Sequence, residues 1–163
     1  METKKAHYLI GLARIVLGWI FLWAFLDKMF GLGFATTSDK SWLAGESPTY
    51  GFLKFATHGP FADIYQAIAG HIVVDTLYMA GLLAVGTALI LGIGVRIASW
   101  SGALMMALFY LAAIPPSHNP LVDEHIIYIF LLLIFCATRA GQWLGLGKWW
   151  SETALVKRFP FLE

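Results

Sequence analysis

The stretch that decides the fold is residues 76–122, TLYMAGLLAVGTALILGIGVRIASWSGALMMALFYLAAIPPSHNPLV, in which Arg96 is the single charged residue. A membrane span needs about 20 apolar residues, so this stretch is long enough for two spans. Gly92 and Arg96 interrupt it, and we expect spans at about 75–94 and 97–114 joined by a very short connection. Because hydrocarbon offers the backbone no partner, each span is predicted to be a helix that satisfies its own N–H and C=O groups.

Two more apolar stretches flank this pair, and we expect them to form spans at about 8–30 and 120–141. Arg14 is the one charge inside the first of them before its end. Lys4 and Lys5 precede the first apolar run, as in a signal peptide. No small-residue cleavage site follows, so the sequence predicts a span that is not cleaved.

A proline-rich turn separates the last two spans. Pro115 and Pro116 should end the third helix near Ile114. Asn119 is then predicted to be the N-cap of the fourth helix, with Pro120 at its first helical position.

The composition excludes several classes of protein. The chain is 59% hydrophobic and 13% charged, whereas a soluble domain is about 45–50% apolar and about 25% charged. Eleven basic against ten acidic residues give no basic surplus, so we expect no nucleic-acid partner. A single cysteine excludes an intrachain disulfide, a CxxC redox pair and a cysteine-cluster metal site. The predicted fold class is all-α, an integral membrane four-helix bundle that contacts membrane lipid.

The charges predict an orientation. Four spans place both termini on one side, and the basic residues expected on that side are Lys4, Lys5, Arg14, Arg96, Arg139, Lys148, Lys157 and Arg158. The opposite side holds Lys28, Lys40 and Lys54. This excess predicts a multi-pass protein of a cell membrane with both termini in the cytoplasm. The acids expected on the outer side are Asp27, Asp39, Glu46, Asp63, Asp75, Asp123 and Glu124.

The loop 31–74 lies outside in this topology. Its aromatic residues argue against disorder and favour a segment that lies on the membrane surface or caps the bundle. Residues 51–57 and 60–69 are candidate short amphipathic helices.

The richest polar cluster surrounds the start of the fourth helix. Asp123 and Glu124 suit a helix N-terminus, where the dipole favours acids. That structural reading leaves His118, His125 and Tyr128 without an explanation. His125 and Tyr128 share a helix face, as do Glu124 and Tyr128.

Three further charges are expected at the same membrane face, because Asp27 and Lys28 end the first helix and Asp75 starts the second. All these groups could converge on one pocket. A carboxylate, a histidine and a tyrosine beside apolar walls suit a quinone site, which needs hydrogen-bond donors and a proton-exchanging group. A metal site built from His118, Asp123 and His125, with His58 or His71, is the weaker alternative because the spacing matches no compact metal motif. No haem, flavin or nucleotide motif is present.

Seven short motifs occur in order along the chain: Arg14–Trp19, Asp27-Lys28, Ser47–Leu53, Gly59–Phe61, Leu91–Ala98, Asn119–Tyr128 and Leu144–Trp150. In these motifs the chain resembles the DoxX-like membrane proteins, a family related to DoxD, the small subunit of archaeal thiosulfate:quinone oxidoreductase. The resemblance implies a four-helix membrane protein of prokaryotic type. For one branch of the family it also implies electron transfer from a sulfur compound to quinone, together with a second subunit. Arg14, Lys28, Arg96, Asp123 and His125 fall in these motifs.

Two classes of function follow. The first is a thiosulfate:quinone oxidoreductase-type subunit, with a sulfur anion meeting Lys28 outside and quinone entering from the bilayer near the fourth helix. Its candidate catalytic residues are Asp123, Glu124, His125 and Tyr128. Its candidate substrate-binding residues are Arg14, Asp27, Lys28, Asp75, Arg96 and His118. The second class is a non-catalytic membrane platform that binds a partner protein or lipid. Either class is compatible with a second subunit or a homo-oligomer. A transporter is disfavoured, because no acid, histidine or lysine lies at the middle of a span.

Overall fold

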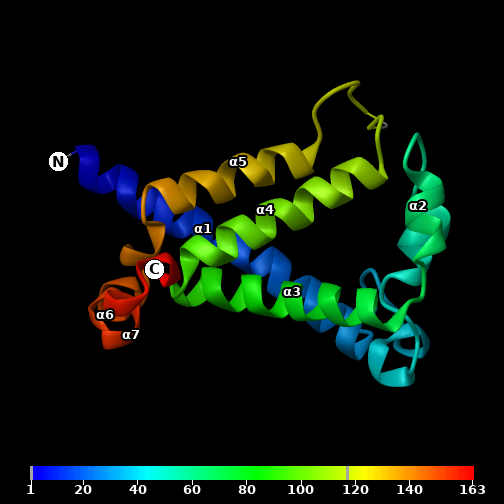
Figure 1. Ribbon diagram of the computed structural model, residues 1–163, viewed down its shortest axis with the longest axis horizontal. Helices are drawn as coiled ribbons and strands as arrows, with labels where there is room; N and C mark the ends of the chain where they lie inside the picture. The colour runs from blue at the N-terminus through cyan, green and yellow to red at the C-terminus, as the bar shows by residue number, and fades with distance from the viewer. Residues whose placement is uncertain (1, 117) are drawn as a thin grey trace.

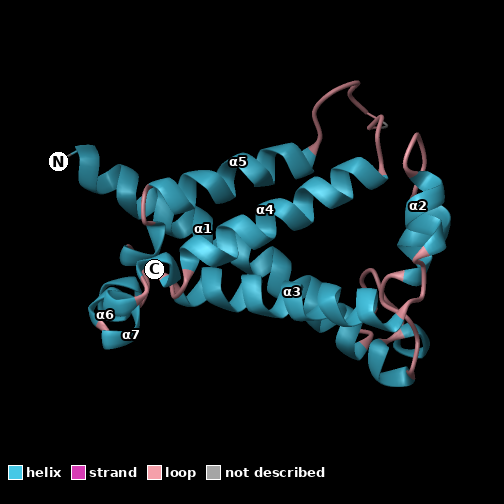
Figure 2. Cartoon of the chain, viewed as in Figure 1, coloured by secondary structure: helices cyan, strands magenta, loops and turns pink. Residues whose placement is uncertain are grey.

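The computed structural model describes residues 2–116 and 118–163, and in these ranges the regular structure is helical, with no strand (Figure 2). The four long helices are α1 (Glu2–Phe30), α3 (Ile72–Leu91), α4 (Val95–Ala112) and α5 (Glu124–Ala137). The short elements between α1 and α3 are η1 (Ser38–Lys40), η2 (Trp42–Ala44), η3 (Phe52–Ala56) and α2 (Ala62–Ala67). After α5 come η4 (Ala140–Gln142), α6 (Gly147–Glu152), α7 (Ala154–Arg158) and η5 (Pro160–Leu162).

The long helices form an elongated bundle in which α1 packs along α3, α4 packs along α5, and α3 contacts α4. Figure 1 places the N-terminus and the C-terminal helices α6 and α7 at the same end of this bundle. We call this the terminal end. The opposite end, the loop end, carries residues 31–71 and the α4–α5 connection, of which residues 113–116 and 118–123 are described.

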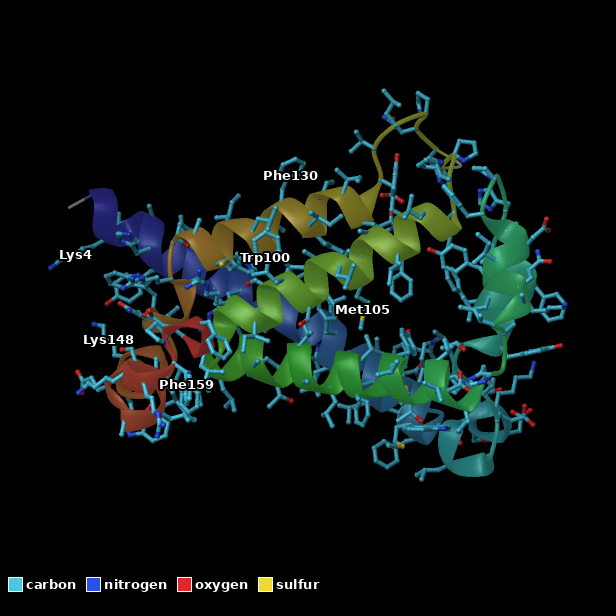
Figure 3. The ribbon with its side chains drawn as sticks, in the orientation of Figure 1. Lys4, Trp100, Met105, Phe130, Lys148 and Phe159 are labelled. Atoms are coloured by element: carbon cyan, nitrogen blue, oxygen red, sulfur yellow. The ribbon has the colours of Figure 1, made fainter. Side chains whose placement is uncertain are left out.

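Three helices of the described chain are long and apolar enough to cross a membrane: α1 over Lys4–Phe30, α3 and α4. The protein is therefore membrane-embedded. The helix α5 is apolar but has 14 residues, or about 21 Å at 1.5 Å per residue. Because a hydrocarbon core is about 30 Å thick, a fourth complete crossing by α5 alone stays a prediction. Phe130 of α5 projects from the bundle, as lipid-facing side chains do (Figure 3), and Trp100 of α4 is also exposed.

The predicted bounds of the fourth helix, 120–141, were wrong at its start. Asn119 does not cap a helix: its Oδ1 accepts hydrogen bonds from the backbone of Leu121 and Val122, at 2.9 and 3.0 Å, and closes a turn. The N-cap is Asp123, whose extended backbone lets its carboxylate reach the first free N–H groups of α5.

The C-terminal bound was also wrong, because α5 ends at Ala137. Two residues later Arg139 adopts φ 49°, in the left-handed region, and the chain turns into η4. The third helix, by contrast, ends at Ala112, two residues before the predicted Ile114. The short helices predicted at 51–57 and 60–69 are confirmed as η3 and α2.

The core lies between the long helices, and two glycines bring α1 and α3 close together. A Cβ added to Gly86 would lie 2.6 Å from the backbone N of Leu22, and one added to Gly18 would lie 2.9 Å from the Cβ of Leu89. Small residues of this kind let helix backbones approach closely in lipid. The close contact fixes the position of α3, which carries Asp75 and Tyr78 to the loop end.

Candidate proton-exchange site at the loop end

Asp123 and His125 form a carboxylate–imidazole pair at the first turn of α5. Oδ1 of Asp123 accepts the backbone N–H of His125 at 3.0 Å and that of Ile126 at 3.3 Å. Oδ2 of Asp123 lies 2.8 Å from Nδ1 of His125. A carboxylate that accepts from Nδ1 fixes the tautomer and the orientation of the ring. Nε2 of His125 has no hydrogen-bond partner in the described ranges, so it is the ring atom available to exchange a proton.

The pair is only partly shielded from water, since 22% of the His125 side chain and 14% of the Asp123 side chain are exposed. Burial on its own would raise the pKa of Asp123. Hydrogen bonds from the His125 ring and from the backbone N–H of Ile126 lower this pKa, as does the electrostatic interaction with His125, and together they outweigh the effect of burial. The pKa of Asp123 is therefore below its ordinary value, and the carboxylate is ionised at neutral pH.

Aromatic rings form the wall behind His125. The ring of Phe109 on α4 meets His125 edge-on, with the centroids 5.9 Å apart. Phe109 also contacts Tyr78 of α3, at 5.8 Å, and Phe52 of η3, at 5.6 Å. Tyr128, one turn along α5, packs against the core. Four elements thus meet around Phe109 and give the imidazole an apolar neighbourhood, while Glu124 is exposed.

Asp27 and Asp75 are buried at the loop end, and both hold the loop 31–71 in place. The carboxylate of Asp27 accepts from the backbone N–H groups of Phe34 and Ala35, at 3.2 and 2.9 Å. Oδ1 of Asp75 accepts from Ser47 Oγ at 2.9 Å and Thr49 Oγ1 at 2.5 Å. Both carboxyl oxygens of Asp27 and Oδ1 of Asp75 thus accept from the loop, which accounts for the burial of these two acids.

Lys28 lies on the last turn of α1, beside a cavity of about 380 Å³ that Trp19, Trp23 and Phe34 also line. No hydrogen bond or ion pair between described residues joins Lys28 to Asp123 or His125. His118 is exposed in the α4–α5 connection.

Arg14 and Arg96 lie at the terminal end. Arg14 is 0% exposed and donates to five backbone carbonyls, those of Leu89, Ile90, Ala140, Trp143 and Leu144. Arg96 is exposed on the first turn of α4. Since α5 alone accounts for about 20 Å between the two ends, neither arginine belongs to the Asp123–His125 pair. Arg14 joins the end of α3 to the turn after α5.

The residues of the alternative metal site do not assemble, since no group of three His, Cys, Asp or Glu side chains in the described chain could hold a metal ion. His71 instead caps α3, where its ring accepts from Val73 N–H at 3.3 Å. His58 contacts the α4–α5 connection, with Nε2 at 3.1 Å from the carbonyl O of Pro115 and Nδ1 at 3.2 Å from that of Ala56. These carbonyls raise the pKa of His58, because both favour the doubly protonated ring.

The docking of His58 was not predicted from the sequence. Its backbone N–H donates to the carbonyl of Ala112 at 3.2 Å. Gly59 adopts φ 78°, and a Cβ there would collide with the carbonyl O of Ile114. The one sequence feature that could have indicated this contact is the His58-Gly59 pair, in which a glycine permits a close approach to another segment. This contact, which we call the loop latch (His58 and Gly59 on Ala112–Pro115), joins the two loops that enclose the start of α5.

Comparisons with protein-family models, with curated proteins and with solved structures find no match to this chain. The resemblance to DoxX-like proteins therefore stays a prediction from its motifs.

Proposed function

We propose that this chain is the membrane subunit of a redox system in which a quinone exchanges protons with His125 at the outer membrane face. The observation that carries the proposal is the Asp123–His125 pair, held at 2.8 Å beside Phe109 at the end of an apolar helix. Quinone reduction consumes two electrons and two protons, so a site for it needs a proton donor that water can recharge. His125 has an apolar side toward Phe109 and a partly exposed side, and both fit this task.

In this proposal each group has a defined role. Nε2 of His125 passes a proton to a quinone oxygen and takes another from water, twice per quinone. Asp123 holds the imidazole in one tautomer. Tyr128 and Phe109 bound the apolar side, from which a quinone enters out of the bilayer. Lys28, half-buried near the same face, is the candidate for attracting an anionic donor.

The electrons come from a sulfur compound such as thiosulfate. Two thiosulfate ions join through a new S–S bond, each giving up one electron, and the two electrons reduce one quinone, directly or through a partner subunit. This part of the proposal rests on the motifs shared with DoxX-like proteins. It places the protein in a prokaryotic cell membrane with the terminal end in the cytoplasm, which agrees with the basic residues there.

The test is a donor screen with the purified full chain in lipid nanodiscs, alone and with any protein that co-purifies. Thiosulfate, sulfite and sulfide are each offered with a water-soluble quinone, whose absorbance reports its reduction. We expect one donor to support reduction and His125→Gln to lower the rate about 100-fold. His7→Gln is the matched control, since His7 stacks on Trp143 at the terminal end. Failure of every donor, with and without partner, would contradict the proposal.

A non-catalytic platform remains the second candidate, and one specific observation favours it. The loop segment exposes large apolar side chains, including Phe34 and Phe55 at 76% each. A platform would use them to hold a partner protein or lipid at the loop end. Stable co-purification of a partner that survives both His125→Gln and Asp123→Asn, without quinone reduction, would support this candidate.

A further inference from the structure

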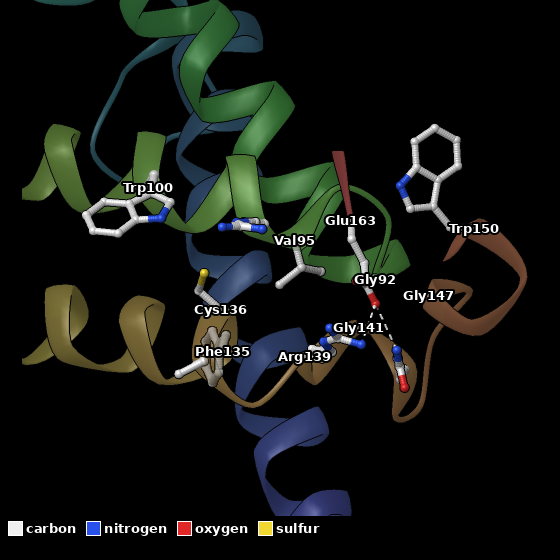
Figure 4. A pocket seen from close by; sticks show the side chains of 13 residues that line it. Gly92, Val95, Trp100, Phe135, Cys136, Arg139, Gly141, Gly147, Trp150 and Glu163 are labelled. Carbon is white, nitrogen blue, oxygen red and sulfur yellow. Dashed lines mark hydrogen bonds and ion pairs between the residues drawn. The ribbon is translucent and has the colours of Figure 1, made fainter. Parts of the chain in front are cut away.

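A cavity of about 300 Å³ with both polar and apolar walls lies at the terminal end, at the other end of the bundle from the Asp123–His125 pair. Figure 4 shows its walls, which come from α4, the end of α5, η4 and the C-terminal segment. Arg96, Arg139 and Gln142 line it together with Trp100, Trp150 and Glu163. The proposed redox function uses none of these residues.

The donors of this cavity already hold an acidic group of the chain. Oε1 of Glu163 accepts from Nε2 of Gln142 at 2.9 Å and lies 3.7 Å from Nη1 of Arg139, as the dashed lines in Figure 4 mark. The backbone carbonyl of Glu163 accepts from the N–H of Arg96, at 2.8 Å, on the first turn of α4. The cavity therefore holds the carboxylate of Glu163 with an amide and a guanidinium, while the first turn of α4 holds the main-chain carbonyl of the same residue. Guanidinium and amide donors are also groups that bind phosphate.

The carboxylate of Glu163 is weakly held. Its contact with Arg139 is long for an ion pair, and the Arg139 side chain is 69% exposed, so water screens the attraction. Among the described lining residues Glu163 is the single acid against two arginines. Counted by its lining side chains, the cavity is net positive with the Glu163 side chain inside, and more positive when that side chain leaves.

The cavity also lies at the ends of two apolar helices, where lipid headgroups are expected. Arg96 and Arg139 flank the ends of the apolar helices α4 and α5, and Trp100 is 60% exposed beside them. Tryptophan and arginine side chains are typical of the boundary between hydrocarbon and headgroups. Basic pockets between helices on the cytoplasmic side are known to bind phosphate headgroups.

We propose that this cavity binds the phosphate group of an anionic phospholipid, with Arg96, Arg139 and Gln142 as its donors and Glu163 as the group that it displaces. The lipid chains then follow the exposed face of Trp100 into the bilayer. The site would anchor lipid at the terminal end whether or not quinone reacts at the loop end.

The test is a titration of the purified full chain in detergent micelles, followed by tryptophan fluorescence, since two tryptophans line the cavity. The probes are dioctanoyl phosphatidylglycerol, phosphatidylcholine with the same chains, and inorganic phosphate. We expect saturable binding of phosphatidylglycerol at about a tenfold lower concentration than phosphatidylcholine. Arg96→Gln/Arg139→Gln should remove this preference, and Glu163→Gln should strengthen phosphatidylglycerol binding several-fold.

The matched control is Lys157→Gln/Arg158→Gln, which removes the same charge from α7, outside the cavity lining. If inorganic phosphate binds and neither lipid does, the cavity is a phosphate site whose ligand is a free anion and not a lipid headgroup. Equal binding of the two lipids would overturn the proposal, as would an arginine variant that behaves like the control. If the double variant does not fold, Arg96→Glu replaces it, because Arg96 is exposed, and it should likewise remove the preference for phosphatidylglycerol.

Discussion

Oδ2 of Asp123 lies 2.8 Å from Nδ1 of His125, while Oδ1 of the same carboxylate caps the helix that carries the histidine. One side chain therefore starts α5 and fixes the imidazole. Any change at Asp123 acts on both the stability of the helix and the orientation of the ring, and the two effects can be separated by the choice of substitution.

Asp123→Asn should separate them. Asparagine caps helices as well as aspartate does, so we expect the melting temperature to fall less than in Asp123→Ala. It removes the charge that fixes the His125 tautomer, so the rate of quinone reduction should fall at least tenfold. Asp123→Ala removes the cap as well and should cost about 1 kcal/mol of unfolding free energy. Equal melting temperatures for the alanine and asparagine variants would contradict the capping role.

Acid should weaken the same contact. The pKa of Asp123 is below its ordinary value in the folded protein. A depressed carboxyl pKa stabilises the fold above the unfolded pKa, and this contribution is lost as the pH falls through the folded value. We expect the melting temperature to drop below about pH 4, and to drop less in Asp123→Asn. Parallel pH profiles for the two proteins would refute this.

The loop latch should respond to pH in the opposite direction. The pKa of His58 is raised, because its ring nitrogens face the carbonyls of Pro115 and Ala56. A raised histidine pKa stabilises the fold below the unfolded value, and the contribution is lost as the pH rises through the folded value. Proteolysis within residues 31–71 should therefore be faster above about pH 7. His58→Gln should make cleavage independent of pH over this window; an unchanged pH profile in the variant would contradict the latch.

Gly59→Ala tests the same latch sterically. The new Cβ would meet the carbonyl O of Ile114, so we expect the variant to undock the loop and to lower the melting temperature. Gly45→Ala is the matched control, because Gly45 also has a positive φ but nothing within 4 Å of its added Cβ. The control should lose about 1 kcal/mol from backbone strain alone. Equal losses for the two variants would show that the contact with Ile114 contributes nothing.

Arg14→Leu should be the most damaging change at the terminal end. It leaves carbonyls at the end of α3 and after α5 without their donor in a buried site. We expect a loss of about 3 kcal/mol or more, measured by thermal unfolding in detergent. Lys5→Gln, an exposed position on the same helix, is the control. Similar melting temperatures for both variants would refute the structural role of Arg14.

The helices could be predicted from hydropathy, because lipid forces each apolar stretch to satisfy its own backbone. The start of α5 could not be predicted in this way, because Asn119 and Asp123 are both good N-cap residues. The sequence does not show which of the two has the extended backbone that an N-cap needs. Asp123 and His125 were placed in one polar cluster by the sequence, but their direct contact was not predicted, because residues two apart do not share a helix face. Asp123 reaches His125 because it precedes the helix as its N-cap. The convergence of Asp27, Lys28 and Asp75 with this pair was not confirmed, because the two carboxylates bind loop groups that lie 7 to 28 residues away in the chain.

Arg14 illustrates a further limit of sequence reasoning. A charge in an apolar run indicates a function in a membrane protein, but its backbone acceptors come from segments up to 130 residues away. The structure shows that Arg14 joins the end of α3 to the turn after α5, which is a structural role. The cavity at Arg96 and Arg139 escaped prediction for the same reason, since Glu163, Gln142 and Arg96 come together only when the C-terminal segment folds onto α4.

The most direct test of the central claim is photolabelling of the full chain in nanodiscs with an azido-quinone, mapped by mass spectrometry. If a quinone binds beside His125, label appears in the peptides that contain residues 109 and 123–128. Excess quinone removes this label, His125→Gln abolishes it, and His7→Gln retains it. Label that lies only at the terminal end, or label around His125 that excess quinone does not displace, would contradict the account.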